Sequence, residues 1–443
     1  MASRIVVLGA GASGEAFLAT LRRLDPEAQV TVVEQELVGG ECSYWACIPS
    51  KTMLRPLEVV HRALLAPGAA EAVRDVDAAR VFGWRDEVAE KDDSSQVRWV
   101  ERQGAEVVRG NGVVAEPGLV RVGARELPYD HLVVATGSLP VAPPVAGLQE
   151  LPHWTSREGT SATAVPRSLA VVGGGAVGCE LAQCYARLGS RVTLVQSGDH
   201  LLPRNDPEAA AILEQAFTEE GIELRLGAKA SRVEADAGGF RLELEGEEPV
   251  ESERLLVATG RKPNVEGFGL ERLGLTVERA GIVVDDRLSA GDRVWAAGDV
   301  TGVALFTHVG KYQGRVAAAN VAGGDARADY RAIPAAIFTD PQVASVGDTS
   351  GRGAITASWP LESVSRSSTF QRPKKPGLLK LYADPERGVL VGATAVGPEA
   401  GEWIGQLTLA VRAEVPVDVI RDTIQPFPTF SEAVHFAARD LEL

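Results

Sequence analysis

The most constraining feature of this sequence is a glycine triplet set between a strand and a helix near the N-terminus. Residues 4–8, RIVVL, have the unbroken apolar character of a buried parallel strand, and they lead into Gly9, Gly11 and Gly14 at GxGxxG spacing. An apolar-periodic helix follows, and then a second strand that ends at Glu34. Such glycines allow a tight turn and close approach of a pyrophosphate, and the acid suits ribose hydroxyls. The sequence therefore predicts a dinucleotide-binding βαβ unit.

The same unit recurs in the middle of the chain. Residues 168–172, SLAVV, lead to Gly173, Gly175 and Gly178, then a helix and a strand that ends at Gln196, where the first copy has an acid. Each copy is followed by a similar strand ending, LVVATGS in the first and LLVATGRKPN in the second. Internal duplication of this kind predicts two related α/β domains with two nucleotide sites.

Two later regions complete the organisation of the chain. The segment VWAAGDV places Asp299 just after another buried strand, where open α/β sheets put ligand contacts. From about residue 331 the pattern changes to short strands with glycine and proline breaks, followed by helices over 402–413 and 416–422. This last region predicts a third domain of α+β type.

The stretch GGECSYWACIPSK holds two of the four cysteines, Cys42 and Cys47. On one regular helix, residues five apart are separated by a rise of about 7.5 Å, which exceeds the roughly 7 Å Cα limit for a disulfide. The glycine pair Gly39 and Gly40 lets the chain fold back, which would place Cys42 at a helix entrance and Cys47 one turn in. A reversible dithiol pair is geometrically possible there, and two unrelated small core residues are the alternative.

Composition narrows the function further. The 443 residues carry 60 acidic and 45 basic side chains, a net charge of −15, which disfavours attraction to nucleic acid or an anionic membrane surface. No signal-peptide pattern and no membrane span is visible, so we expect a cytoplasmic protein. No second Cys or His pair with ligand spacing lies near the cysteines, so no metal site is predicted.

In this order the motifs resemble the flavin-dependent pyridine nucleotide disulfide oxidoreductases, the family of dihydrolipoamide dehydrogenase, glutathione reductase and mercuric reductase. The resemblance covers essentially the whole chain. It rests on the first glycine triplet with its acid, the GGxCxxxxCIPSK box, the ATG of residues 135–137, the second triplet with ATGRKPN, and AAGDV.

The resemblance implies a set of cofactor contacts. The first half would hold FAD and the second NAD(P)H, with Gly112 near the adenine, Thr136 and Gly137 on the phosphate side, and Asp299 on the ribityl chain. Residues implied for FAD are Gly9, Gly11, Gly14, Glu34, Gly40, Lys51, Gly112, Thr136, Gly137 and Asp299. Those implied for NAD(P)H are Gly173, Gly175, Gly178, Gln196 and Gly260.

The resemblance also implies a redox relay. Cys47 corresponds to the thiol that faces the flavin and Cys42 to the thiol that exchanges with substrate. Lys51 and Glu180 match the family's ion pair beside flavin and nicotinamide, where a cation favours negative charge on the reduced flavin. Cys179 and Cys184 repeat the five-residue spacing, but both fall inside one helix, and we expect small buried residues there.

The C-terminal segment departs from the family pattern. The family usually carries the segment His-Pro-Thr-x-x-Glu, whose histidine acts across a dimer interface. In this sequence Phe427 replaces that histidine, while the final glutamate is kept as Glu432. A phenyl ring carries no proton, and loss of a positioned acid–base group typically removes about 10² to 10⁴ in rate. His435 could replace the missing group or simply be packed, and a cis bond before Pro428 is expected from the family.

Two further departures bear on substrates. Tyr44 and Trp45 replace the smaller residues usual between the cysteines, and either stacking on a planar substrate or core filling would explain them. Gln196 is neutral, so it would not repel the 2′-phosphate of NADPH. No arginine follows it immediately, although Arg204 is eight residues on. The donor preference leans slightly to NADPH over NADH.

The sequence thus predicts an α/β fold with two Rossmann-like dinucleotide-binding domains and a C-terminal α+β interface domain. We expect an FAD-binding domain over 1–145 and 265–330, an NAD(P)H-binding domain over 146–264, and a dimerisation domain over 331–443. The expected function is a homodimeric NAD(P)H oxidoreductase that passes electrons through FAD and the Cys42–Cys47 pair to a disulfide or related small-molecule acceptor. Direct reduction of a quinone, dye or oxygen by the flavin is the alternative, and an exchange-inactive subunit of a larger complex is a third.

Overall fold

The computed structural model describes residues 2–236 and 238–443. The chain divides into two compact units, each made of three separate stretches. The first unit comprises residues 1–49, 86–141 and 261–329, and the second comprises 50–85, 142–260 and 330–443. Each is described by itself.

The first unit is organised around a six-stranded sheet in the order β19-β20-β7-β1-β2-β3. Strands β1, β2, β3, β7 and β20 pair in parallel, and β19 joins antiparallel to β20. Both faces of β1 are buried, as its apolar run requires in a parallel sheet. The strands are β1 Arg4–Leu8, β2 Gln29–Glu34, β3 Ala105–Arg109, β7 His131–Val134, β19 Ser289–Gly291 and β20 Val294–Ala296.

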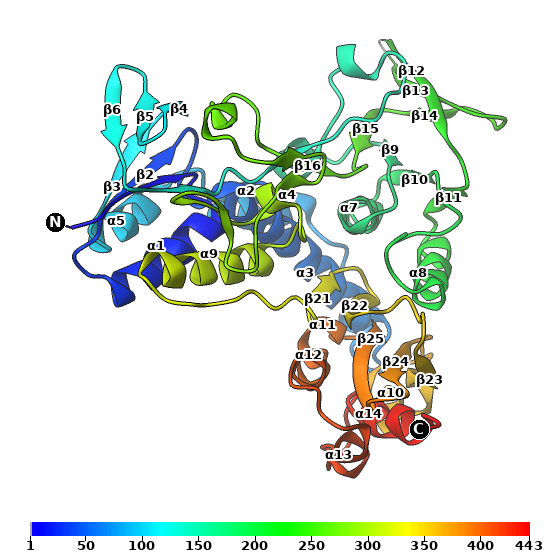
Figure 1. Ribbon diagram of the computed structural model, residues 1–443. Coiled ribbons are helices and arrows are strands. Elements are labelled where there is room, and N and C mark those ends of the chain that lie inside the picture. Colours follow the sequence, from blue (N-terminus) through cyan, green and yellow to red (C-terminus); the bar gives the residue numbers. More distant parts are fainter. Residues whose placement is uncertain (1, 237) are drawn as a thin grey trace. The chain divides into compact units, whose positions relative to one another are not determined.

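Two long helices of the first unit, α1 (Ala12–Leu24) and α9 (Thr307–Val321), lie side by side against this sheet (Figure 1). Gly314 on α9 makes the close approach possible, because a Cβ at that position would collide with the backbone oxygen of Ser13. Further elements of this unit are α2 Gly40–Tyr44, α5 Ser94–Arg102, the meander β4 Gly112–Glu116, β5 Leu119–Val122 and β6 Arg125–Pro128, the pair β8 Ser138–Pro140 and β16 Arg261–Pro263, and the pair β17 Val277–Glu278 and β18 Gly281–Ile282.

The second unit contains the repeated nucleotide-binding pattern. Its parallel sheet runs β11-β10-β9-β15, and every residue of β9 is buried. The helices α7 (Ala176–Arg187) and α8 (Pro207–Glu219) connect these strands (Figure 1). The strands are β9 Ser168–Val172, β10 Arg191–Gln196, β11 Glu223–Leu226 and β15 Arg254–Val257, beside an antiparallel sheet of β12 Ala230–Asp236, β13 Gly239–Leu244 and β14 Val250–Ser252.

The C-terminal part of the second unit is an antiparallel sheet in the order β21-β22-β25-β24-β23, packed against helices that bury one continuous apolar cluster. The strands are β21 Pro334–Ile337, β22 Gln342–Gly347, β23 Ile355–Pro360, β24 Leu378–Asp384 and β25 Val389–Gly397. The helices are α10 Ser365–Phe370, α11 Ala400–Trp403, α12 Gly405–Arg412, α13 Val417–Asp422 and α14 Glu432–Arg439. The expected fold class, two Rossmann-like halves and an α+β region, is confirmed.

Helix α3 (Cys47–Leu64) begins in the first unit and continues in the second, where Met53, Leu54 and Leu57 join the largest apolar cluster. The helix α4 (Ala78–Val88) adds Val81 and Phe82 to the same cluster, and α6 (Ser156–Ser161) also belongs to this unit.

Candidate functional site

Cys42 and Cys47 form a disulfide with their Cα atoms 4.8 Å apart. Cys42 lies in the short helix α2, while Cys47 is the first residue of α3. The expectation that Cys47 lies one turn inside a helix that starts near Cys42 is therefore wrong. Helix α2 ends because its C-cap residue, Trp45, takes φ −138° and leaves the helical region. Gly39 and Gly40 adopt φ +115° and +66°, and so fold the chain back as predicted.

Thr307, the first residue of α9, contacts both sulfurs. Its Oγ1 lies 3.1 Å from Cys42 Sγ and 3.5 Å from Cys47 Sγ. The hydroxyl must be the donor, because a disulfide sulfur carries no proton. Sequence reasoning missed this residue. The only signal was its place eight residues after Asp299.

The two aromatics between the cysteines differ in role. Tyr44 is only 3 % exposed and its hydroxyl donates to the Val38 carbonyl at 2.8 Å. Burial, reinforced by the charge of Asp93, raises the pKa of Tyr44 to about 12. Tyr44 is therefore a core residue and not a stacking platform. Trp45 is partly exposed and carries Lys91 5.7 Å from its ring centroid.

The first glycine triplet has the shape that a dinucleotide requires. Gly9 takes φ +102°, and a Cβ there would collide with the Ala135 carbonyl, while a Cβ on Gly14 would collide with the Gly9 carbonyl. Glu34 braces the turn, because its Oε2 accepts from the Ala10 N–H at 2.8 Å. Gly40 meets Gly11, whose Cα would lie 2.8 Å from a Cβ on Gly40. These residues fit the FAD that the sequence implies.

Residues expected on the far side of that cofactor lie at the ends of β7, β8 and β20. Asp299 accepts from the Ser138 hydroxyl at 2.6 Å, and burial raises the pKa of Asp299 above its usual value. The Thr136 hydroxyl donates to the Asn264 carbonyl at 2.6 Å. Gly137 takes φ +74° with open space beside it, and Gly112 is packed against Leu8 and Val33.

The second triplet repeats the first closely. A Cβ on Gly173 or Gly178 would strike a backbone carbonyl, whereas a Cβ on Gly175 would meet nothing within 4 Å. Gln196 takes the place of Glu34, because its Oε1 accepts from the Gly174 N–H at 2.9 Å. Gly260 adopts φ +134° in open space.

Cys179 and Cys184 are free and fully buried in α7. Burial raises the pKa of the Cys179 thiol far above its usual range and that of Cys184 to about 12. Neither thiol forms a reactive thiolate near neutral pH. The expectation of small buried residues is confirmed.

The predicted pair of Lys51 and Glu180 forms within the second unit. Lys51 Nζ lies 2.6 Å from Glu180 Oε2. The Glu180 side chain is only 6 % exposed, against 32 % for Lys51, so the carboxylate depends on its partners for charge compensation. Glu180 Oε1 accepts from the Phe338 N–H at 3.0 Å.

The C-terminal segment is ordered around the expected cis bond between Phe427 and Pro428. Phe427 is 74 % exposed. Glu432 begins α14 and accepts from the Thr429 N–H at 3.3 Å. The Nδ1 of His435 lies 2.9 Å from the Arg421 carbonyl, so one ring nitrogen is engaged inside the fold.

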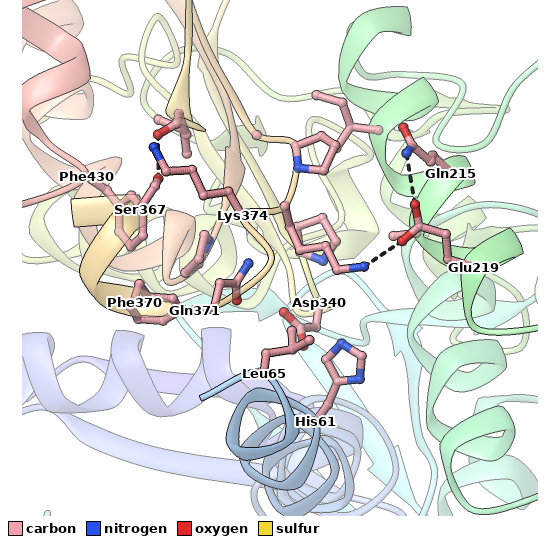
Figure 2. Close-up of a pocket in the computed structure, with 18 of the residues that line it drawn as sticks. His61, Leu65, Gln215, Glu219, Asp340, Ser367, Phe370, Gln371, Lys374 and Phe430 are labelled. Carbon is pink, nitrogen blue, oxygen red and sulfur yellow. Dashed lines mark hydrogen bonds and ion pairs between the residues drawn. The ribbon is translucent and has the colours of Figure 1, made fainter. Parts of the chain in front are cut away.

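A separate cavity of about 110 Å³ lies wholly within the second unit. His61 faces it from α3 and Leu65 from the turn after that helix, Gln215 and Glu219 face it from α8, and Phe370 closes it from α10 (Figure 2). Glu219 is held by Lys375 at 2.6 Å and by Gln215 at 2.9 Å. Burial, with the charge of Arg187, lowers the pKa of His61.

Two searches over residues 2–236 and 238–443 gave negative results. No helix there is long and apolar enough to cross a membrane. In the same residues no group of three or more histidine, cysteine or acidic side chains is placed to hold a metal ion.

Comparison with known proteins finds one family whose domains together match nearly the whole chain. Residues 3–326 match the family described as pyridine nucleotide-disulphide oxidoreductase, and residues 333–438 match the dimerisation domain of that family. The dimerisation-domain match supports a homodimer. Members of this family depend on FAD and use NAD(P)H.

Individual relatives cover nearly the full chain. The mercuric reductase of Acidithiobacillus ferrooxidans is 35% identical over 98% of this chain and 82% of its own. Dihydrolipoyl dehydrogenase 2 of Haloarcula marismortui is 33% identical over 98% of this chain and 96% of its own. The crystal structure of LpdA from Mycobacterium tuberculosis is similar with a TM-score of 0.89 and 28% identity, covering 99% of both chains. This chain therefore belongs to the flavin-dependent pyridine nucleotide-disulphide oxidoreductases, and it is an enzyme of that family.

Proposed function

We propose that this enzyme takes electrons from NAD(P)H through FAD to the Cys42–Cys47 disulfide and passes them to a disulfide or related small-molecule acceptor. The observation that carries the proposal is the disulfide itself, which joins Cys42 in α2 to Cys47 at the start of α3 and accepts a hydrogen bond from the Thr307 hydroxyl. Once the bond opens, the N-terminus of α3 favours a thiolate on Cys47, and the Thr307 hydroxyl can donate to a thiolate on Cys42.

The division of labour that we propose follows the repeat. Residues 1–145 and 265–330 hold FAD, residues 146–264 hold NAD(P)H, and residues 331–443 form the interface of a homodimer. We assign FAD binding to Gly9, Gly11, Gly14, Glu34, Gly40, Lys51, Gly112, Thr136, Gly137 and Asp299. We assign NAD(P)H binding to Gly173, Gly175, Gly178, Gln196 and Gly260.

FAD, when bound, supplies the hydride chemistry. Two electrons delivered at Cys47 break the S–S bond and leave thiolates, one of which takes up a proton in solution. The Cys42 thiolate then attacks one sulfur of an acceptor disulfide, forms a mixed disulfide and releases the other acceptor sulfur as a thiol. Cys47 next attacks the Cys42 sulfur and displaces the second acceptor thiol, which restores the Cys42–Cys47 bond. The Thr307 hydroxyl holds negative charge on Cys42 during exchange, and Lys51, with Glu180, provides the cation that we place beside the flavin.

NADPH is the donor that we favour. Gln196 is neutral, and its Oε1 is occupied by the Gly174 N–H. The remaining amide nitrogen can donate a hydrogen bond and does not repel a 2′-phosphate. Gln196→Glu should therefore raise KM for NADPH by about tenfold and change KM for NADH much less. Equal changes for both nucleotides would count against this assignment.

A second candidate function is direct reduction of a quinone, dye or oxygen by the flavin. Phe427 favours it, because no proton donor stands where the family places its acid–base histidine. The names of the relatives point to different substrates, mercuric ion for one and dihydrolipoyl groups for another. No cysteine follows Cys184 in this sequence.

An anaerobic reductive titration separates the two functions. The purified flavoprotein is titrated with dithionite and then with NADPH or NADH. The number of electrons taken up per flavin is counted, and the long-wavelength absorbance is recorded. A working relay takes up four electrons and develops a thiolate–flavin band that Cys47→Ser abolishes and the control Cys184→Ala keeps. Uptake of only two electrons without the band would refute the relay and favour direct reduction of quinones or oxygen.

A further inference from the structure

One face of α7 holds the loop that precedes β22. Glu180, Gln183 and Arg187 are spaced three and four apart, so their side chains project from the same side of the helix. All three bond to Phe338 or Asp340. The loop and the helix belong to the same unit.

Gln183 makes the central contacts. Its Oε1 accepts from the Asp340 N–H at 2.8 Å, and its Nε2 donates to the Asp340 carbonyl at 2.8 Å and to Glu220 at 3.0 Å. Gln183 is only 1 % exposed. A buried amide with all these bonds fixes the loop backbone, because any unmade bond would leave a desolvated polar group.

Arg187 closes the far end of this contact. Its guanidinium lies 2.6 Å from Glu220 and 3.1 Å from Asp340 Oδ2. Burial alone would lower the pKa of Arg187, but the bonds and charges of Glu220 and Asp340 outweigh it and raise that pKa. The carboxyl group of Asp340 is therefore anchored together with its backbone.

At the near end the loop touches both members of the Lys51–Glu180 pair. The Phe338 N–H donates to Glu180 Oε1, and the centroid of the Phe338 ring lies 4.9 Å from Lys51 Nζ. The backbone N–H thus engages one carboxylate oxygen, and Lys51 lies against the other, Oε2, at 2.6 Å. The loop thereby sets the rotation of the carboxylate and the position of the ammonium group.

We propose that the Phe338–Asp340 loop, anchored on α7 by Gln183 and Arg187, positions the Lys51–Glu180 pair for flavin reduction. Gln183 is a positioning residue, because it acts on Lys51 only through the loop and Glu180. This inference rests on the proposed function, which places Lys51 beside the flavin.

A double-mutant cycle between Gln183→Met and Lys51→Ala tests it. The rate constant for flavin reduction by NAD(P)H is measured by anaerobic stopped flow, and the visible spectrum of the bound flavin reports changes in its surroundings. Gln183→Met should slow reduction about fivefold in the parent protein, equivalent to about 1 kcal/mol of coupling. In the Lys51→Ala background the same change should alter the rate by less than about twofold.

Two further variants complete the design. Gln215→Met is the matched control, because Gln215 lies in the same unit and bonds to Glu219 on α8 but not to the loop. It should leave the rate unchanged. Phe338→Leu keeps the N–H that Glu180 accepts and removes only a partly exposed ring. It takes the place of Gln183→Met in the cycle if that variant does not fold. In the Lys51→Ala background it should leave the rate of flavin reduction unchanged.

The outcomes separate this inference from the function on which it rests. Slowing by Lys51→Ala, with the effects of Gln183→Met and Phe338→Leu lost in that background, supports the positioning role. Slowing by Lys51→Ala with both other effects undiminished refutes the positioning role and leaves the proposed function standing. No slowing by Lys51→Ala removes Lys51 from the site and overturns the inference with it.

Discussion

Replacing Thr307 by valine should make the exchanging thiol less acidic. The Thr307 hydroxyl lies 3.1 Å from Cys42 Sγ, and once the disulfide is reduced the same hydroxyl would donate to a thiolate. Valine keeps the shape of the side chain and removes only that donor. Thr307 is thus predicted to lower the pKa of Cys42.

The size of this effect follows from the kind of bond. A hydrogen bond to a charged group contributes about 1.5–3 kcal/mol, and one pKa unit corresponds to about 1.36 kcal/mol. The full range is therefore roughly one to two pKa units. Because Cys42 and Thr307 are both partly exposed, water replaces some of the lost bond, and we expect a rise of about one unit.

The assay is alkylation of the reduced protein by limiting iodoacetamide between about pH 5 and pH 10, a range that brackets ordinary thiol pKa values. Site-resolved mass spectrometry separates labelling of Cys42 from that of Cys47. Ser43→Ala is the control, because the Ser43 hydroxyl donates to the Gly39 carbonyl at 3.2 Å. A midpoint for Cys42 that stays the same in Thr307→Val, or moves equally in the control, would refute the role given to Thr307.

Three other predictions test separate parts of the structure. Phe427→His should raise turnover with small disulfides by up to about 10² if a missing acid–base group limits exchange, and no gain with several disulfides, measured by steady-state kinetics, would exclude that limit. Gly175→Ala should leave the melting temperature unchanged, because a Cβ there meets only open space, and it should weaken NAD(P)H binding at least tenfold in a fluorescence titration, because we assign that residue to the nucleotide. Gly178→Ala should lower the melting temperature, because its Cβ strikes the Gly173 carbonyl. The pKa of His61 is lowered in the folded protein, so the unfolded chain binds the extra proton first and stability should fall as the pH drops below about 6.5. His61→Gln should flatten that fall in apparent melting temperature, by at most the slope of one proton, about 1.4 kcal/mol per pH unit, and an unchanged slope would mean that other groups cause it.

The parts of the fold that local sequence dictates were predictable. Strand β1 begins and ends at the predicted residues, because an apolar run buried on both faces has few alternatives. Glu34 and Gln196 end the strands that follow the two glycine triplets, as the sequence indicated, but the backbone N–H that each side chain accepts was not predicted. The place of Cys47 was not predictable, since helix α2 ends on the backbone angle of Trp45 and no glycine or proline marks that point.

Contacts between distant parts of the chain were the ones that sequence reasoning missed. Thr307 lies 260 residues beyond Cys47, and its hydroxyl reaches the sulfurs only because α9 packs beside α1 in the first unit. The bond from the Phe338 N–H to Glu180 spans 158 residues and uses a backbone group, which leaves no residue-type signal at all. Periodicity and motif spacing report on neighbours along the chain, and these contacts come from tertiary packing.

The duplicated nucleotide-binding pattern shows how one geometry can carry two chemistries. Glu34 Oε2 and Gln196 Oε1 each accept a backbone N–H from the residue after the first glycine of their triplets, at 2.8 and 2.9 Å. That bracing bond needs an acceptor oxygen and no charge, so an amide can replace a carboxylate without loosening the turn. The two copies then differ at the other terminal atom of the side chain. In Glu34 this atom is Oε1, which accepts the Glu36 N–H, and in Gln196 it is Nε2, which lies beside Gly198. Because only that atom changes from acceptor to donor, the preference for NADPH that we propose at the second copy requires no change in the backbone of the fingerprint.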